Sequence, residues 1–321
     1  MKIIRKARFA LLSAAALTLM GIGSAARAEF PEKPVEMTVL FGGTANTIAQ
    51  LLSELMSEEL GQPVVPVSRT GGGGAVGYSH VLATRPDGYN IVWNSNSINT
   101  IHHMGRVPFD YSNFTPIARI STEVPALAVN ADEGWETLSE MAEALKASDA
   151  PLKVGISGKG SFTHLTSAAL FDAMGLGDKV TFISYGEGKA PIELLAGRID
   201  AAIQWPGQFK SYVDAGDLDV IAVTGPERID ILPDVPTAQE QGVDVDITMW
   251  RGLAAPANTP DDVIETLAAA AERAVAREEF SEAAETIGFV PSYEGPEAFG
   301  ELVAEDDAFY GNLLQNLGLS M

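Results

Sequence analysis

The chain has 321 residues, 46% of them hydrophobic, which is typical of a globular protein large enough for two domains. It has no cysteine, which excludes disulfides, a cysteine nucleophile, thiolate-bound zinc, iron–sulfur clusters and a lipid on an N-terminal cysteine. Its net charge of −22 at pH 7 excludes nucleic acid as a partner, because no basic patch could displace phosphate counterions.

The first 28 residues have the pattern of a secretory signal peptide. Basic residues from Lys2 to Arg8 precede an apolar run at 9–23, and the small-residue pattern Ala26-Arg27-Ala28 follows. No later segment approaches the ~18 apolar residues of a membrane span. We therefore predict cleavage after Ala28 and a soluble product in a bacterial periplasm.

From residue 35 onward, short β-rich runs alternate with helical stretches. A strand at 35–41, a glycine turn, a helix at 46–60 and a strand at 63–67 form a β-α-β start. Further strands are predicted at 91–94, 127–130, 153–157, 180–184, 201–205 and 220–224. This alternation predicts an α/β fold with parallel sheets.

Helix starts are marked by capping patterns. Thr137 and Glu140 form a capping box, and Thr259 is placed as the N-cap of a helix with Pro260 in its first turn. Residues 261–317 indicate almost continuous helix, interrupted at 288–296, without a strand that could found a third sheet. We expect this part to pack on an existing domain.

Two glycine motifs are too incomplete to bind nucleotides. Gly72, Gly74 and Gly77 form a G-x-G-x-x-G, but polar uncharged residues stand where the dinucleotide fingerprint needs an acid. The P-loop resemblance at Gly158-Lys159 lacks the leading glycine and the following Ser or Thr. We predict no cofactor and interpret the glycine run as a turn with close helix packing.

The four histidines, His80, His102, His103 and His164, have no pairing that would put two metal ligands on one helix face. We therefore predict no metal site.

Polar turns recur at the carboxyl ends of predicted strands, the ends that face the ligand crevice in open α/β sheets. Two of them lead directly into helices, where backbone N–H groups and the helix dipole favour a carboxylate. The alternative is that these turns are only good helix caps. The candidate ligand-binding residues are Phe41, Gly42, Gly43, Thr44, Ala45, Asn46, Asn94, Ser95, Ser97, Lys159, Ser161, Phe162, Thr163 and Gln204.

Several longer segments resemble the periplasmic substrate-binding receptors of tripartite tricarboxylate transporters, the Bug-type receptors. The resemblance runs over nearly the whole chain after residue 28. Its most specific pieces are Phe30-Pro31-Glu32-Lys33-Pro34, Pro86-Asp87-Gly88-Tyr89, Thr163-His164-Leu165, Tyr185-Gly186-Glu187-Gly188-Lys189-Ala190-Pro191, Leu232-Pro233-Asp234-Val235-Pro236-Thr237 and Trp250-Arg251-Gly252-Leu253.

The resemblance implies a two-lobed receptor of the periplasmic-binding-protein (Venus-flytrap) type with a ligand cleft between its lobes. It implies that residues 29–125 and 250–321 form lobe one and that 126–249 form lobe two. It further implies a non-enzymatic monomer that binds a small organic carboxylate and delivers it to membrane permease subunits. Gly42 to Asn46 and Ser161 to Thr163 correspond to the carboxylate-binding turns.

The first turn departs from the family pattern. It is two residues shorter, and Asn46 and Gln50 stand where the family usually has an Asp and an Arg. The shorter turn leaves room for a ring, so the ligand class includes aromatic acids beside di- and tricarboxylates. The turn also lacks an acid that could have met a ligand amine, which disfavours amino acids.

Two other functions remain open at this point. The closed receptor could be read by a sensor protein instead of a permease. A periplasmic serine hydrolase could use Ser157 or Ser161 with His164, because a serine three residues before a histidine can share its helix face.

Overall fold

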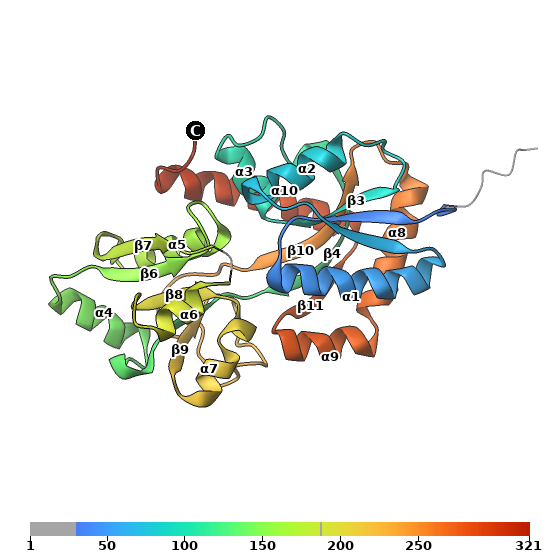
Figure 1. Ribbon diagram of the computed structural model, residues 1–321. Coiled ribbons are helices and arrows are strands. Elements are labelled where there is room, and N and C mark those ends of the chain that lie inside the picture. The colour runs from blue at the N-terminus through green and yellow to red at the C-terminus, as the bar shows by residue number, and fades with distance from the viewer. Residues whose placement is uncertain (1–29, 187) are drawn as a thin grey trace, which may run out of the picture.

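The computed structural model describes residues 30–186 and 188–321, which form two β-sheets in separate halves of the molecule (Figure 1). The predicted signal peptide lies outside the described residues. Within these residues, no helix is both long enough and apolar enough to cross a membrane.

The first sheet has six strands in the order β11-β4-β10-β3-β1-β2. The strands are β1 (Val35–Val39), β2 (Val64–Ser68), β3 (Asn90–Ser95), β4 (Phe114–Glu123), β10 (Met249–Pro256) and β11 (Val290–Glu294). β1 is parallel to β2 and β3, whereas β10 is antiparallel to both β3 and β4. The last two strands of the chain therefore complete a sheet that its first part begins.

Helices cover both faces of this sheet. α1 (Gly43–Leu60), α8 (Asp261–Val275) and α9 (Glu278–Ile287) bury apolar side chains such as Leu52, Leu267 and Phe280 against one face. α2 (Ala75–Leu82), α3 (Ser97–His103) and α10 (Pro296–Asn316) pack on the other, with Tyr78 and Phe299 in its core. This double cover explains why strands β1, β3 and β10 are largely buried on both faces.

The second sheet has five strands in the order β7-β6-β8-β5-β9. The strands are β5 (Ala126–Asn130), β6 (Leu152–Ile156), β7 (Val180–Ser184), β8 (Ala201–Gln204) and β9 (Leu218–Val223). α4 (Leu138–Ala147) and α5 (Phe162–Ala173) contribute to the core on one face, and α6 (Ala190–Leu195) and α7 (Lys210–Ala215) lie by the core on the other. Short 3₁₀ segments occur at Gly72–Gly74, Tyr111–Asn113, Ala131–Glu133, Gly177–Lys179 and Pro206–Gln208.

The chain crosses between the two halves at 124–125, from β4 to β5, and returns along 224–248, from β9 to β10. Figure 1 shows these connections running side by side between the two sheets. The predicted two-lobed α/β fold is confirmed.

The prediction of parallel sheets was wrong in part, because β5 and β10 run antiparallel to their neighbours. Strands β4, β10 and β11 were also missed. Pro116 interrupts β4, and the structure accommodates it beside an irregularity in the pairing with β10, beyond the stretch of β4 that pairs with β11. β11 lies at 290–294, within the interruption at 288–296 that was predicted between the C-terminal helices.

Helix starts follow the sequence with two corrections. α4 has the predicted capping box, with Glu140 N donating to Thr137 Oγ1 at 3.2 Å. α1 begins at Gly43, three residues before the predicted start, so the expected turn is the first turn of the helix. Pro260, not Thr259, caps α8, because the Thr259 hydroxyl donates to the carbonyl of Pro256 instead.

Candidate ligand-binding site

A cavity of about 280 Å³ lies between the two halves of the molecule. The half that holds the second sheet contributes residues 157–163, between β6 and α5, and Trp205 after β8. The half that holds the first sheet contributes Phe41, Gly73, Ser97, Thr100, Ile101, Arg106, Met249 and Arg251. Ligand pockets have volumes of roughly 300 to 1,000 Å³, so this cavity is near the lower end of that range and suits a small molecule.

The loop from β6 to α5 is held in shape by its own side chains. Ser161 is the N-cap of α5, and its Oγ accepts the backbone N–H of His164 at 3.3 Å. The Thr163 hydroxyl accepts the N–H of Ser157 at 3.0 Å and lies 3.1 Å from the Ser161 hydroxyl. These side chains line the cavity mainly by fixing the loop, because their oxygens already have partners within it.

Backbone N–H groups at the start of α5 remain available. The amides of Phe162 and Thr163 have no hydrogen-bond partner in the part of the chain that the structure describes. Both residues line the cavity, at the positive end of a 12-residue helix. This wall can therefore donate hydrogen bonds to an anion.

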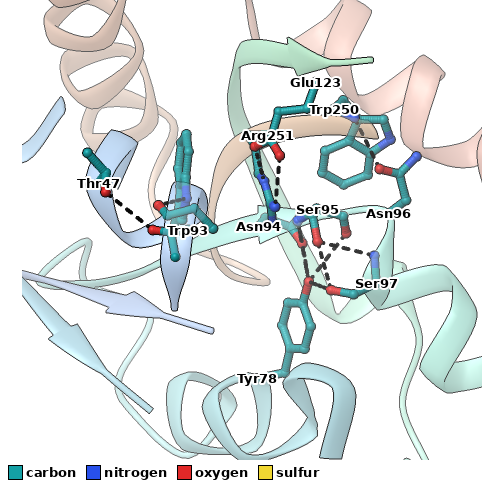
Figure 2. A network of polar contacts seen from close by, with 12 residues as sticks. Thr47, Tyr78, Trp93, Asn94, Ser95, Asn96, Ser97, Glu123, Trp250 and Arg251 are labelled. Atoms are coloured by element: carbon teal, nitrogen blue, oxygen red, sulfur yellow. Dashed lines mark hydrogen bonds and ion pairs between the residues drawn. The ribbon is translucent and has the colours of Figure 1, made fainter. Parts of the chain in front are cut away.

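The opposite wall contains a buried ion pair at the centre of the first sheet. Arg251 is 3% exposed, and its Nε and Nη2 donate to Oε1 and Oε2 of Glu123 at 2.7 and 3.3 Å (Figure 2). Its remaining nitrogen, Nη1, is buried and has no partner among the described residues. The Phe41 ring lies 5.7 Å from the guanidinium carbon. Arg251 thus places a buried positive charge at the wall of the cavity.

A buried hydroxyl and amide network supports the same wall. Tyr78 donates to Asn94 Oδ1 at 2.6 Å, and its hydroxyl lies 3.0 Å from that of Ser97 (Figure 2). The Ser95 hydroxyl lies 2.8 Å from Ser97 Oγ. Burial raises the pKa of Tyr78 to about 12, so the phenol keeps its proton. The network fixes Ser97 at the cavity and leaves Asn94 and Ser95 behind it.

Asp306 of α10 ties β10 to α3 behind this wall. Its Oδ2 accepts hydrogen bonds from Trp250 Nε1 at 2.6 Å and from Asn96 Nδ2 at 2.7 Å. Asn96 Oδ1 in turn accepts the backbone N–H of Trp250 at 3.1 Å. Burial raises the pKa of Asp306 to about 6. The position of Arg251, next to Trp250, therefore depends on three elements.

Two contacts join the two halves of the molecule beside the cavity. Arg106 Nη2 donates to the carbonyl of Lys159 at 3.1 Å. Phe162 approaches Tyr310 of α10 in the other half, with ring centroids 6.4 Å apart, and stacks on Trp205 of its own half at 5.8 Å. Within the described residues, the cavity lining holds three cationic side chains and no acidic one, although the whole chain is strongly acidic.

The structure brings together six of the residues predicted from the sequence. These are Phe41, Ser97, Lys159, Ser161, Phe162 and Thr163, all of which line the cavity. The others lie outside its lining: Gly42, Gly43, Thr44, Ala45, Asn46, Asn94, Ser95 and Gln204. Gln204 is fully buried in β8 and donates to the Ser157 hydroxyl at 3.3 Å.

Sequence reasoning missed Arg106, Arg251, Trp205 and Gly73 as lining residues. Gly73 has a φ of 71° inside a run of four glycines with positive φ, a path that favours glycine at each position. Trp205 is the last residue of the predicted strand at 201–205, and in the structure it directly follows the end of β8 at Gln204. Arg251 could have been noticed in the sequence because it is a charged residue within an otherwise apolar segment.

The geometry supports neither a serine hydrolase that uses His164 nor a histidine metal site among the described residues. His164 Nδ1 accepts the N–H of Gly160 at 3.0 Å, and no hydrogen bond joins its ring to a serine among the described residues. Burial and the nearby Lys159 lower the pKa of His164. No group of metal-ligating side chains occurs within residues 30–186 and 188–321.

The sequence profile of the tripartite tricarboxylate transporter family receptors matches residues 48–319. The chain belongs to this receptor family. Its members are solute-binding proteins and not enzymes. A relative from Agrobacterium vitis, a UPF0065 protein of the TAR-I ttuE-ttuC' intergenic region, is 33% identical over 83% of this chain and 78% of its own length.

Three solved structures have the same fold, and one of them is named as a member of this family. A solute-binding protein of this family from Polaromonas, determined without ligand, has a TM-score of 0.76 at 31% identity and covers 89% of this chain and 99% of its own. MatC from Rhodopseudomonas palustris, with bound malate, has a TM-score of 0.77 at 24% identity over 89% and 100% of the two chains. Rpa4515 of R. palustris, with adipate, has a TM-score of 0.80 at 23% identity over 91% and 99%. The fold is thus that of two-lobed periplasmic binding proteins.

Proposed function

We propose that this protein is a periplasmic receptor that binds a small organic carboxylate between its lobes and delivers it to a tripartite transporter permease. The observation that carries the proposal is the cavity itself. Free amides at the start of α5 face a lining with Arg106, Lys159 and Arg251. Donors from both lobes favour an oxygen anion, which would stabilise the closed form of the receptor.

The family supports the ligand class. MatC holds malate and Rpa4515 holds adipate, each a small dicarboxylate in a protein of the same fold. Three aromatic rings, those of Phe41, Phe162 and Trp205, also line the cavity of this chain. Aromatic acids therefore belong in the ligand panel beside aliphatic di- and tricarboxylates.

A thermal-shift panel tests the ligand class. It includes malate, succinate, adipate, citrate and benzoate, with glucose and sodium chloride as controls for sugars and ionic strength. A ligand at 100 times its dissociation constant adds about 2.7 kcal/mol to the free energy of unfolding. The class is refuted if glucose raises the melting temperature and no carboxylate does.

The amide donors can be tested by a matched pair of variants, Phe162→Pro and Phe162→Ala. Both remove the aromatic ring, but only proline removes the N–H. Phe162 is the first residue of α5, where proline is tolerated, and Ser161 already has the extended conformation (φ −71°, ψ 163°) that proline requires before it. A hydrogen bond to a charged group contributes about 1.5 to 3 kcal/mol, so Phe162→Pro should bind the carboxylate roughly tenfold to hundredfold more weakly than Phe162→Ala. Equal affinities in calorimetry would show that this amide does not touch the ligand.

The cellular context is part of the proposal. We propose that residues 1–28 are removed on export, that residues 29–125 with 250–321 and residues 126–249 are the two closing lobes, and that the receptor acts as a monomer. The backbone amides of Gly42 to Asn46 and the hydroxyl of Thr44 remain predicted contacts, made when the lobes close further. Mass spectrometry of the periplasmic protein should give Glu29 as the first residue, and an intact Met1 would contradict this.

A further inference from the structure

The arginine at the centre of the first sheet has more hydrogen-bonding capacity than the protein uses. A guanidinium carries five N–H donors in one plane. The pair with Glu123 uses one on Nε and one on Nη2. Both N–H groups of Nη1 remain, with one of Nη2, and Nη1 has no acceptor among residues 30–186 and 188–321. The unused edge is the one that binds a carboxylate through two parallel hydrogen bonds.

Burial makes this spare capacity costly. Arg251 is 3% exposed and Glu123 is 1% exposed, so water does not replace the missing acceptor. Buried polar groups in folded proteins almost always have partners, and an unpartnered charged donor calls for an explanation. The nearby Phe41 ring shields a face of the guanidinium without accepting a hydrogen bond in its plane.

The surrounding residues prepare the arginine for a ligand. Glu123 grips one edge of the guanidinium and fixes its orientation. Trp250, the preceding residue, is anchored to Asn96 and Asp306. The other two cationic residues of the cavity differ, because Lys159 and Arg106 are exposed to solvent. Among these three cations, only Arg251 is buried and paired with a carboxylate.

We propose that the free edge of Arg251 binds a second carboxylate of the ligand, so that this receptor selects diacids over monoacids of the same chain length. This inference rests on the proposed function, which places the first carboxylate of the ligand at the start of α5. Arg251 and α5 belong to opposite walls, so a diacid bridges the lobes while a monoacid leaves the buried arginine without an acceptor. The second case loses affinity because the donor stays unsatisfied.

The test compares diacids and monoacids of equal length: succinate with butyrate, glutarate with pentanoate and adipate with hexanoate. Calorimetry on the wild-type protein should show that the best diacid binds at least about tenfold more tightly than its monoacid, the change expected from one charge-assisted hydrogen bond. Equal binding within a pair would overturn the role of Arg251 but leave the carboxylate receptor intact. Failure of every carboxylate in the broader panel would instead refute the proposed function.

Variants assign the preference to this residue. Arg251→Gln alone would leave Glu123 buried without a counter-charge, so the main variant is Glu123→Gln/Arg251→Gln, which removes both charges. It should bind the best diacid about tenfold to hundredfold more weakly and leave the monoacid within about threefold. The matched control is Glu294→Gln/Arg119→Gln, which removes another ion pair of the first sheet whose residues do not line the cavity, and it should keep the preference. An unchanged ratio of diacid to monoacid affinity in the double variant would overturn the proposal.

Arg251→Lys covers the case in which the double variant does not fold. It keeps the positive charge and the pair with Glu123 but cannot present two parallel donors. Its diacid preference should fall at least about fivefold while its monoacid affinity is unchanged. A preference equal to that of the wild type would show that charge alone, and not the free edge of the arginine, acts on the ligand.

Discussion

The hydroxyl of Thr163 should contribute to folding more than to ligand contact, and Thr163→Val tests this. Valine keeps the shape of the side chain and removes the oxygen. The Ser157 N–H then loses its acceptor at 3.0 Å, and the Ser161 hydroxyl loses its neighbour at 3.1 Å. Thr163 is 3% exposed, so water cannot easily replace either partner. A buried group left without its partner costs about 1 to 3 kcal/mol, and we expect a loss of that size in the free energy of unfolding.

The same helix provides the control. Thr166 is fully buried, and its Oγ1 has no hydrogen-bond partner among the described residues. Thr166→Val therefore removes an unsatisfied polar atom at almost constant volume and should be neutral or stabilising. Two Thr→Val changes three residues apart are thus expected to act in opposite directions.

Urea denaturation at constant m-value measures both variants. Calorimetry with the best carboxylate gives the second quantity, because a Thr163 hydroxyl that contacts ligand would lower affinity without lowering stability. The reasoning fails if Thr163→Val leaves the free energy of unfolding within about 0.5 kcal/mol of the wild type, or if both variants lose the same amount.

Two further predictions concern the region behind the cavity. Asp306 has a pKa raised from 3.8 to about 6 by burial, so the folded state holds a proton that the unfolded state has released, and wild-type stability should fall as the pH rises through this range. Both donors bind the same oxygen of Asp306, so Asp306→Asn can keep both hydrogen bonds. Denaturation at about pH 5 and about pH 7.5 should show that the free energy of unfolding of this variant depends less on pH than that of the wild type. An unchanged pH dependence would contradict the assignment. Gly252→Ala would place a Cβ 2.6 Å from the carbonyl oxygen of Ala118 and into the Phe299 ring, and should lower the free energy of unfolding by more than about 2 kcal/mol. The control Gly177→Ala meets only Asp172 Oδ1 at 3.5 Å, so similar losses in the two variants would contradict the steric explanation.

The sequence predicted the elements whose patterns are local. Strands β1, β3 and β6 are short runs rich in apolar and β-branched residues and bounded by polar turns, and all three were found with small errors at their ends. β4 and β10 were missed because Pro116 and Arg251 violate the pattern of a buried strand. Both violations are tolerated for tertiary reasons: irregular pairing accommodates the proline, and Glu123 pairs with the arginine. A prediction made from one segment at a time cannot include the irregular pairing or the partner glutamate, because both depend on distant parts of the chain.

The same distinction separates the predicted and missed halves of the site. The loop at 157–163 could be predicted because a polar turn between a strand and a helix places its amides without help from elsewhere. The opposite wall depends on pairs far apart in the sequence. Arg251 and Glu123 are 128 positions apart, and Asn96 and Asp306 are 210 apart. Each of these residues looks like an ordinary polar position until the fold brings its partner beside it.

The buried ion pair is better explained by specificity than by stability. Replacing a buried pair with well-packed apolar residues is often neutral or stabilising, because the Coulomb energy hardly repays the loss of hydration. Arg251 and Glu123 are therefore expected to contribute little to the free energy of unfolding. The pair leaves a fixed set of charged donors at the cavity, with Glu123 holding the orientation and Nη1 left without an acceptor. A donor that is already fixed loses little conformational entropy when the ligand binds. The ion pair destabilises the unliganded protein, but it favours binding of an acid whose carboxylate can reach Arg251.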